Sequence, residues 1–187
     1  VEAFKPSRPA CLNVYGGVTR YGTTKLHVVS GTTKHKSKYT NGLGQPSRNI
    51  VIPEYKDVLV ETLLPEGKRL FGTTERMNTW VFQQDNDPTH NKPVQEALQA
   101  FNKKPRTRVE KLQDWPPSSP DLSPIENLWA IVDAKVQARG CKDFDEFQAA
   151  VFEEWAAVPQ ELCANLIGSM TKRVAACIKQ EGGKINF

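Results

Sequence analysis

The sequence predicts an α/β domain with a mixed β-sheet, flanking helices and a helical tail. Residues 11–29 carry two β-branched and aromatic runs around glycines, which is typical of an antiparallel hairpin. Two further short apolar runs, 79–84 and 109–115, alternate with helical patterns. From about residue 141 only amphipathic helical patterns follow. Strands that alternate with helices indicate a mixed α/β sheet, and the closing helices form the tail.

The hairpin strands are predicted on either side of a tight connection around "RYGTT". The apolar runs that form them flank Gly16, Gly17 and Gly22. Residues 30–49 are rich in Ser, Thr, Gly, Lys and Asn, and we expect a loop there.

A helix is predicted from Pro53, where apolar side chains begin to recur every three or four residues. Because proline and glycine break helices, we expect this helix to end at Pro65 and Gly67. The run 79–84, "TWVFQQ", then predicts a fully buried strand.

The segment 92–104 predicts a helix with Pro93 near its first turn. The apolar face of this helix consists of Val94, Ala97, Leu98 and Phe101.

A strand is predicted next, at 109–115. The segment after it, "PPSSPDLSP" at 116–124, is rich in proline and cannot continue a strand.

A long helix is predicted after the proline-rich connection. Ser123 suits its N-cap, Pro124 its first turn and Glu126 its third position, and Gly140 suits its C-terminal stop. Ile125, Leu128 and Trp129 are predicted to pack in the core. Two further amphipathic helices are predicted, one in each of the segments 143–158 and 159–183.

Composition indicates an ordinary folded domain. Of the 187 residues, 39% are hydrophobic and 25% charged, and the net charge is +4. We expect one domain, 1–187, with a core at about 10–140 and a tail at about 141–187. No apolar run could cross a bilayer, so no membrane partner is expected. No two cysteines have the CxxC spacing of a zinc site, so we expect none. We expect an intracellular protein whose cysteines are reduced thiols: Cys11, Cys141, Cys163 and Cys177.

Polar side chains gather in "FQQDNDPTH", residues 82–90, directly after a predicted strand. Asp85 is placed where ligands collect in α/β sheets, at the carboxyl end of a strand. If the two strands are neighbours, the proline-rich connection brings Glu126 to the same end of the sheet. Two facing carboxylates suit Mg²⁺. Locally, however, an Asx-type turn explains Asp85 equally well, and a helix N-terminus alone favours Glu126.

Two long blocks, "WVFQQDNDPTH" and "DWPPSSPDLSPIENLW", resemble the second and third catalytic blocks of the Tc/mariner superfamily of DDE transposases. "LNVYGGVTRYGTTKLHVV" resembles that family's central hairpin, and "VPQELCANLIGSMTKRVAACIKQEGG" resembles its C-terminal segment. The resemblance covers nearly the whole chain and implies an RNase H-like fold.

The resemblance also implies a site. Asp85 matches the family's second catalytic acid and Glu126 its third, both as ligands of a two-metal site for Mg²⁺ or Mn²⁺. Asn86 and His90 fall in the same motif as supporting residues. Asp121 and Asn127 are expected to shape the loop and the helix start.

The chain departs from the family pattern in two ways. Forty residues, 86–125, separate the two acids, which exceeds the spacing in the family's better-known members. The family's first catalytic Asp lies on a strand before the hairpin, and we expect that strand upstream of Val1. Glu2 is no substitute for this Asp, since it matches no family motif. We therefore expect the isolated chain to lack its first strand and to be inactive.

The resemblance implies a DNA transposase that cleaves transposon ends and transfers the strand into target DNA. The alternative is a degenerate or domesticated remnant that acts as a non-catalytic DNA-binding or interaction module. A nuclease acting on RNA–DNA hybrids shares the fold and is a third alternative.

Two basic clusters, "KHKSK" and "KKPRTR", are expected to contact DNA phosphates, although each also suits a solvated loop. The partners implied are double-stranded DNA and a second copy of the chain, as a homodimer on DNA. We expect nuclear localisation from the family. The DNA-binding candidates are Lys34, Lys36, Lys38, Lys103, Lys104, Arg106 and Arg108.

Overall fold

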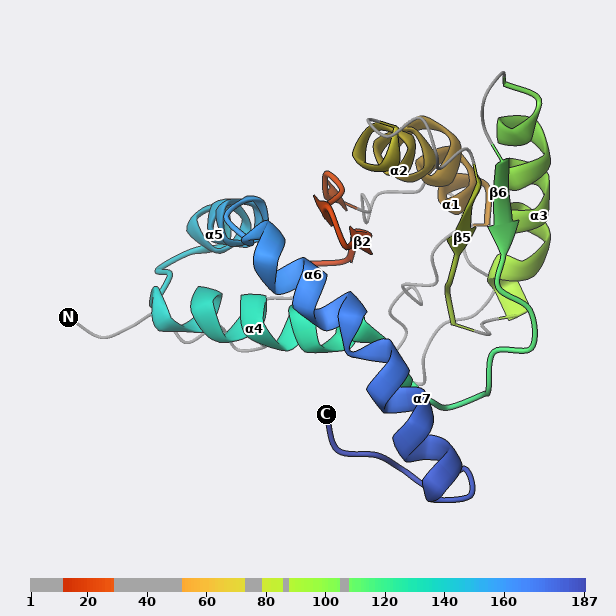
Figure 1. Cartoon of the computed structure of the whole chain (residues 1–187). Helices are drawn as coiled ribbons and strands as arrows, with labels where there is room; N and C mark the ends of the chain where they lie inside the picture. The colour runs from red at the N-terminus through yellow and green to blue at the C-terminus, as the bar shows by residue number, and fades with distance from the viewer. Residues whose placement is uncertain (1–11, 29–51, 73–78, 86–87, 105–107) are drawn as a thin grey trace, which may run out of the picture.

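The computed structural model describes residues 12–28, 52–72, 79–85, 88–104 and 108–187. Figure 1 shows two groups of elements with the N-terminal hairpin between them. One group contains α1, α2, α3, β5 and β6, and the other contains α4, α5 and α6. Each group has its own cluster of buried apolar side chains. The predicted loop at 30–49 lies outside the described residues. The predicted order of strands and helices is confirmed for the residues that the structure describes.

The predicted hairpin is confirmed, but it is interrupted in the middle. Four short strands make two antiparallel pairs, β1 (Val14–Tyr15) with β4 (His27–Val28) and β2 (Val18–Thr19) with β3 (Gly22–Thr23). Val14 faces Val28 in the outer pair, whereas Val18 faces Thr23 in the inner pair. The later strand therefore holds one extra residue between the pairs, which is the signature of a β-bulge.

The first helix does not end at Pro65 and Gly67, so that prediction was wrong. It continues from α1 (Ile52–Val58) through a π-helical turn, η1 (Leu59–Leu63), into α2 (Leu64–Phe71). A proline ring inside an α-helix clashes with the carbonyl four residues earlier. Here the wider π-helical turn precedes Pro65, and the Leu64 N–H donates to the Leu59 carbonyl.

Gly67 serves close packing rather than termination. A Cβ atom placed on it would lie only 2.6 Å from the Trp80 ring. We expect Gly67→Ala to destabilise the fold by about 1–3 kcal/mol, because overpacking forces the ring or the helix to move. Urea unfolding measures this. The matched control is Gly168→Ala, in a helix where nothing lies within 4 Å of the added Cβ. Equal effects from the two substitutions would contradict the packing role of Gly67.

Two parallel strands form the neighbouring pair, β5 (Thr79–Phe82) and β6 (Arg108–Lys111). Both end earlier than predicted. The prediction that the first strand is fully buried was wrong, since its side chains alternate and Val81 is 54% exposed. Trp80 and Phe82 face the core instead. The alternation arises because the helices of this group cover only one face of the strand pair.

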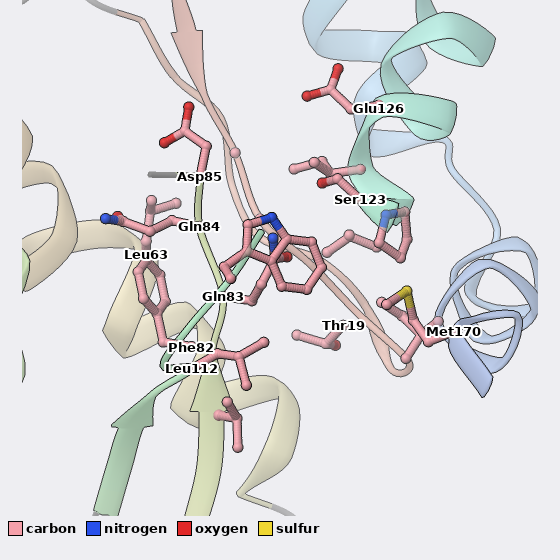
Figure 2. A pocket seen from close by; sticks show the side chains of 18 of the residues that line it. Thr19, Leu63, Phe82, Gln83, Gln84, Asp85, Leu112, Ser123, Glu126 and Met170 are labelled. Atoms are coloured by element: carbon pink, nitrogen blue, oxygen red, sulfur yellow. The ribbon is translucent and has the colours of Figure 1, made fainter. Parts of the chain in front are cut away.

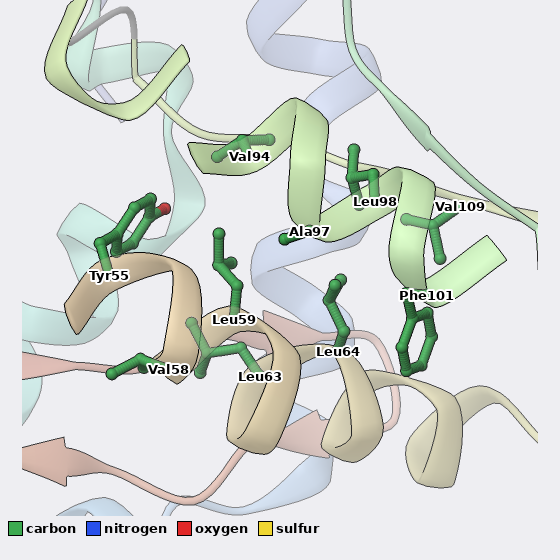
Figure 3. Packing of buried hydrophobic residues seen from close by; sticks show 10 residues of the cluster. All are labelled: Tyr55, Val58, Leu59, Leu63, Leu64, Val94, Ala97, Leu98, Phe101 and Val109. Carbon is green, nitrogen blue, oxygen red and sulfur yellow. The ribbon is translucent and has the colours of Figure 1, made fainter. Parts of the chain in front are cut away.

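Helix α3 (Pro88–Asn102) begins four residues before the predicted start, and Pro93 lies inside it. Its predicted apolar face is confirmed and packs against α1, η1 and α2 (Figure 3). At its end the Asn102 amide donates to the Val109 carbonyl and accepts from the Val109 N–H, which ties the helix to β6. The cluster comprises Tyr55, Val58, Leu59, Leu63, Leu64, Val94, Ala97, Leu98, Phe101 and Val109.

A short 3-10 turn, Pro120–Leu122, leads into the long helix α4 (Pro124–Ala138). The predicted stop is confirmed, because Gly140 has a φ of 62°, which glycine adopts readily. The tail holds α5 (Phe144–Ala156), α6 (Gln160–Gly168) and α7 (Met170–Lys179). The segment 159–183 thus forms two helices rather than the single one predicted, with the break at Ser169.

The second cluster forms between α4, α5 and the hairpin, and it includes the buried Leu128 and the half-buried Ile125 and Trp129. Cys163 is buried, and burial raises the pKa of its thiol. Cys141 and Cys177 are half-buried, whereas Cys11 lies outside the described residues. Within the described part of the chain, none of the helices has the length and apolar character that crossing a bilayer requires.

Candidate active site

The two predicted acids come to one cleft. Asp85 follows β5 and Glu126 lies in the first turn of α4, and both line a cavity of about 930 Å³. Figure 2 shows the two side chains on opposite walls of this cavity. The prediction that the two strands are neighbours is confirmed, since β5 and β6 pair in parallel. The chain after β6 therefore leaves from the same end of the strand pair as Asp85.

The rest of the cleft is mainly apolar. The hairpin supplies one wall through Tyr15 and the Gly16–Gly17 pair, while β5 supplies another through Trp80 and Phe82. Trp115 and the prolines that follow it in the connection to α4 also line the cavity. Asp85 and Glu126 are the acidic residues of the described lining, so a cation bound in this cavity would take its carboxylate ligands from these two.

Asp85 has His90 beside it. The Nδ1 atom of His90 lies 3.5 Å from Oδ1 of Asp85, whose side chain is 76% exposed. The His90 ring packs on Tyr55 with ring centroids 4.1 Å apart, and the Tyr55 hydroxyl donates to Gln84 Oε1 at 2.8 Å. Gln84 directly precedes Asp85, so these contacts fix the end of β5. Asn86 lies outside the described residues.

Glu126 is held differently. It is the third residue of α4, and its N–H donates to the Ser123 carbonyl. Ser123 occupies the predicted N-cap position, but its side chain makes no capping hydrogen bond. Among the residues that the structure describes, none forms a hydrogen bond or ion pair with the Glu126 carboxylate. Its position therefore depends on the backbone at the start of α4.

A buried arginine, which the sequence did not single out, fixes that backbone. Arg173 on α7 is 2% exposed and donates to the Asp121 carbonyl and to Asn127 Oδ1, both at 2.7 Å. Its Nε donates to Ser169 Oγ at 2.8 Å. Burial lowers the pKa of the guanidinium, and nearby Asp121 acts in the opposite direction. The expectation that Asp121 and Asn127 shape this region is confirmed by these bonds.

Only some of the basic candidates can be placed. Lys103, Lys104 and Arg108 are exposed at the far end of α3 and on β6. Lys104 lies over the Phe101 ring, and Arg108 pairs with Glu110 at 2.9 Å. These three are absent from the cleft lining. The remaining candidates lie outside the described residues: Lys34, Lys36, Lys38 and Arg106.

The donor set fits a hard divalent cation in part. Mg²⁺ takes oxygen ligands, and one or two carboxylates with substrate phosphates and water suffice for it. Asp85 and Glu126 provide two exposed carboxylates on one cleft. Across the ranges that the structure describes, no three His, Cys, Asp or Glu side chains come together as a metal-binding group. The two acids are therefore of the right chemical type for such an ion, and the described residues supply no third acid beside them.

Known proteins are similar to this chain in sequence or in fold. The chain is 32% identical over 128 residues to the Tcb1 transposase of Caenorhabditis briggsae and 34% identical over 133 residues to the Tcb2 transposase of the same species. It is 32% identical over 129 residues to the Tc1 transposase of Caenorhabditis elegans. These matches cover 68–69% of this chain but 43% of each relative, so the chain spans less than half of their length. No family model matches it.

Solved structures agree on the fold. The catalytic domain of the Mos1 mariner transposase superposes with a TM-score of 0.66 at 18% identity, covering 92% of this chain and 76% of that one. The Mos1 mariner paired end complex with Mn superposes with a TM-score of 0.63 at 16% identity, covering 100% of this chain and 48% of that one. The RNase H-like α/β fold is thereby confirmed. On sequence and fold together, the chain belongs to the Tc/mariner superfamily of transposases.

Proposed function

We propose that this chain is the catalytic part of a DNA transposase that cleaves transposon ends and transfers the strand into target DNA. The observation that carries the proposal is the placement of Asp85 and Glu126 on opposite walls of one cleft. The relatives that share about a third of the sequence are transposases, which supports the same reaction class.

Asp85 and Glu126 are proposed as ligands of Mg²⁺ or Mn²⁺, in a two-metal site completed by a third acid outside the described residues. Such ions activate the attacking water or hydroxyl and stabilise the leaving oxygen in phosphoryl transfer. His90 and Tyr55 keep Asp85 at the end of β5, since the imidazole contacts its carboxylate and stacks on the tyrosine.

The partners proposed are double-stranded DNA and a second copy of the chain. Solved Mos1 assemblies include a pre-cleavage transpososome and a strand transfer complex, which supports DNA as the partner of this relative. Lys103, Lys104 and Arg108 are exposed cations available to phosphates, and none of the three belongs to the described cleft lining. A nuclear location is part of the same proposal and is tested by fluorescence microscopy of the tagged protein.

The experiment that tests the proposal is Mn²⁺-dependent nicking of supercoiled DNA. We would compare residues 1–187 with the same chain extended by whatever residues precede Val1 in its reading frame. Because the relatives are more than twice as long as the matched region, we expect cleavage from the extended protein only. An extended protein that binds DNA but cuts with neither Mn²⁺ nor Mg²⁺ would contradict the proposal and favour the non-catalytic remnant.

A further inference from the structure

Glu126 needs an external support. Its carboxylate extends into the cleft without a hydrogen bond or ion pair from the described residues, and the N-cap serine of its helix forms no capping bond. Metal ligands are usually held by neighbouring hydrogen bonds, and the loss of such a partner weakens metal binding by roughly 10–100-fold. For Glu126 that function must act through the helix start itself.

Arg173 contacts the helix start from both sides of Glu126. One of its nitrogens donates to the carbonyl of Asp121, which lies in the 3-10 turn before α4. Another donates to the side chain of Asn127, the residue directly after Glu126. Its third bond, to Ser169, anchors the guanidinium at the break between α6 and α7. A planar guanidinium with three bonds in fixed directions defines the relative position of all three groups.

The C-terminal residues close the same network. The Ile185 N–H donates to Asp121 Oδ2 at 2.8 Å, and Ile185 is 2% exposed. The Asn127 amide donates to the Phe187 carbonyl at 3.0 Å, and the Phe187 ring lies over Arg173 with 5.3 Å from Cζ to the ring centroid. Buried charges are expensive without partners, so this arginine has a structural cost that its bonds offset.

We propose that Arg173 is a positioning residue for Glu126, so that the affinity of the cleft for a divalent cation depends on this arginine of the tail. The inference rests on the proposed function, because Glu126 must be a metal ligand for it to hold. It assigns a role in the site to α7, which lies outside both sequence blocks that carry the catalytic acids.

The test uses Mn²⁺ alone as the probe and the extended protein of the nicking experiment, in which the third acid of the proposed site can be present. Paramagnetic broadening of the Asp85 and Glu126 amide signals, followed by NMR during a Mn²⁺ titration, gives the apparent affinity of the cleft for the ion. We expect Arg173→Met to weaken this affinity, read from the broadening at Glu126, by at least about tenfold. Lys172→Met is the matched control, since it removes the same charge from the adjacent, exposed position of α7 and should leave the affinity unchanged.

A second variant covers the case in which Arg173→Met does not fold. Asn127→Ala removes one of the three bonds of Arg173, together with the bond from Asn127 to the Phe187 carbonyl, and leaves the bonds of Arg173 to Asp121 and Ser169. It should therefore shift the Glu126 titration in the same direction. Broadening at Glu126 that a folded Arg173→Met or Asn127→Ala variant leaves unchanged would overturn the positioning role alone. A wild-type chain without broadening at Glu126 would overturn the proposed metal site and, with it, the positioning role.

Discussion

Replacing Glu126 by glutamine is expected to reduce Mn²⁺-dependent DNA cleavage by the extended protein at least about 100-fold, or about 2.7 kcal/mol in the activation free energy. Glutamine keeps the shape of the side chain but removes the negative charge that a hard cation requires. Glu126 is exposed and forms no pair with the described residues, so the fold itself should lose little. Asp85→Asn is expected to have an effect of similar size for the same reason.

The control for this experiment is Glu161→Gln. Glu161, like Glu126, is an exposed acid in the first turn of a helix. Each substitution therefore removes the same kind of favourable interaction with a helix N-terminus, worth about 0.3–1 kcal/mol. Glu161 lies outside the cleft lining. Rates are measured by nicking of supercoiled DNA, with thermal unfolding as a check of the fold. Equal activity of Glu126→Gln and Glu161→Gln would remove Glu126 from the catalytic machinery.

The meeting of Asp85 and Glu126 could be predicted from the sequence because it depends on two local features. A short apolar run ended directly at Asp85, and a stiff proline-rich connection placed Glu126 at the start of a helix. Parallel pairing of β5 with β6 then brought both to one cleft. The apolar face of α3 was equally accessible, since helical spacing alone identifies it.

Two features of the structure could not be predicted from local sequence rules. Pro65 marks a helix end by local rules, and only the wide π-helical turn before it lets the helix continue. Arg173 looks like one of several surface cations on an amphipathic tail. Its burial arises because the tail folds back over Asp121 and Asn127, which are 52 and 46 residues away in sequence. No periodicity or short motif encodes such a contact.

Trp155 is expected to give the largest loss of stability of any single substitution considered. It is 2% exposed, and its ring stacks on Trp129 with centroids 4.5 Å apart. Its Nε1 donates to the Thr24 carbonyl at 2.7 Å, and Thr24 lies in the stretch between the two strand pairs of the hairpin. A Cβ on Gly16 would lie 2.8 Å from the Trp155 ring, so the hairpin lies directly against the indole.

Two substitutions separate these contributions in urea unfolding. Trp155→Ala removes the ring and should cost about 3–5 kcal/mol, the usual range for a large core aromatic. Trp155→Phe keeps much of the packing but leaves the Thr24 carbonyl without its donor, which should cost about 1–3 kcal/mol. Phe144→Ala, at a 44% exposed position of the same helix, should change stability by less than about 1 kcal/mol. If Trp155→Phe costs no more than this control, the bond to Thr24 does not hold the hairpin. Gly16 and Gly17 line the cleft, and Gly16 lies against the Trp155 ring of α5. In that case packing against this ring, without the hydrogen bond, would hold the hairpin wall of the cleft in place.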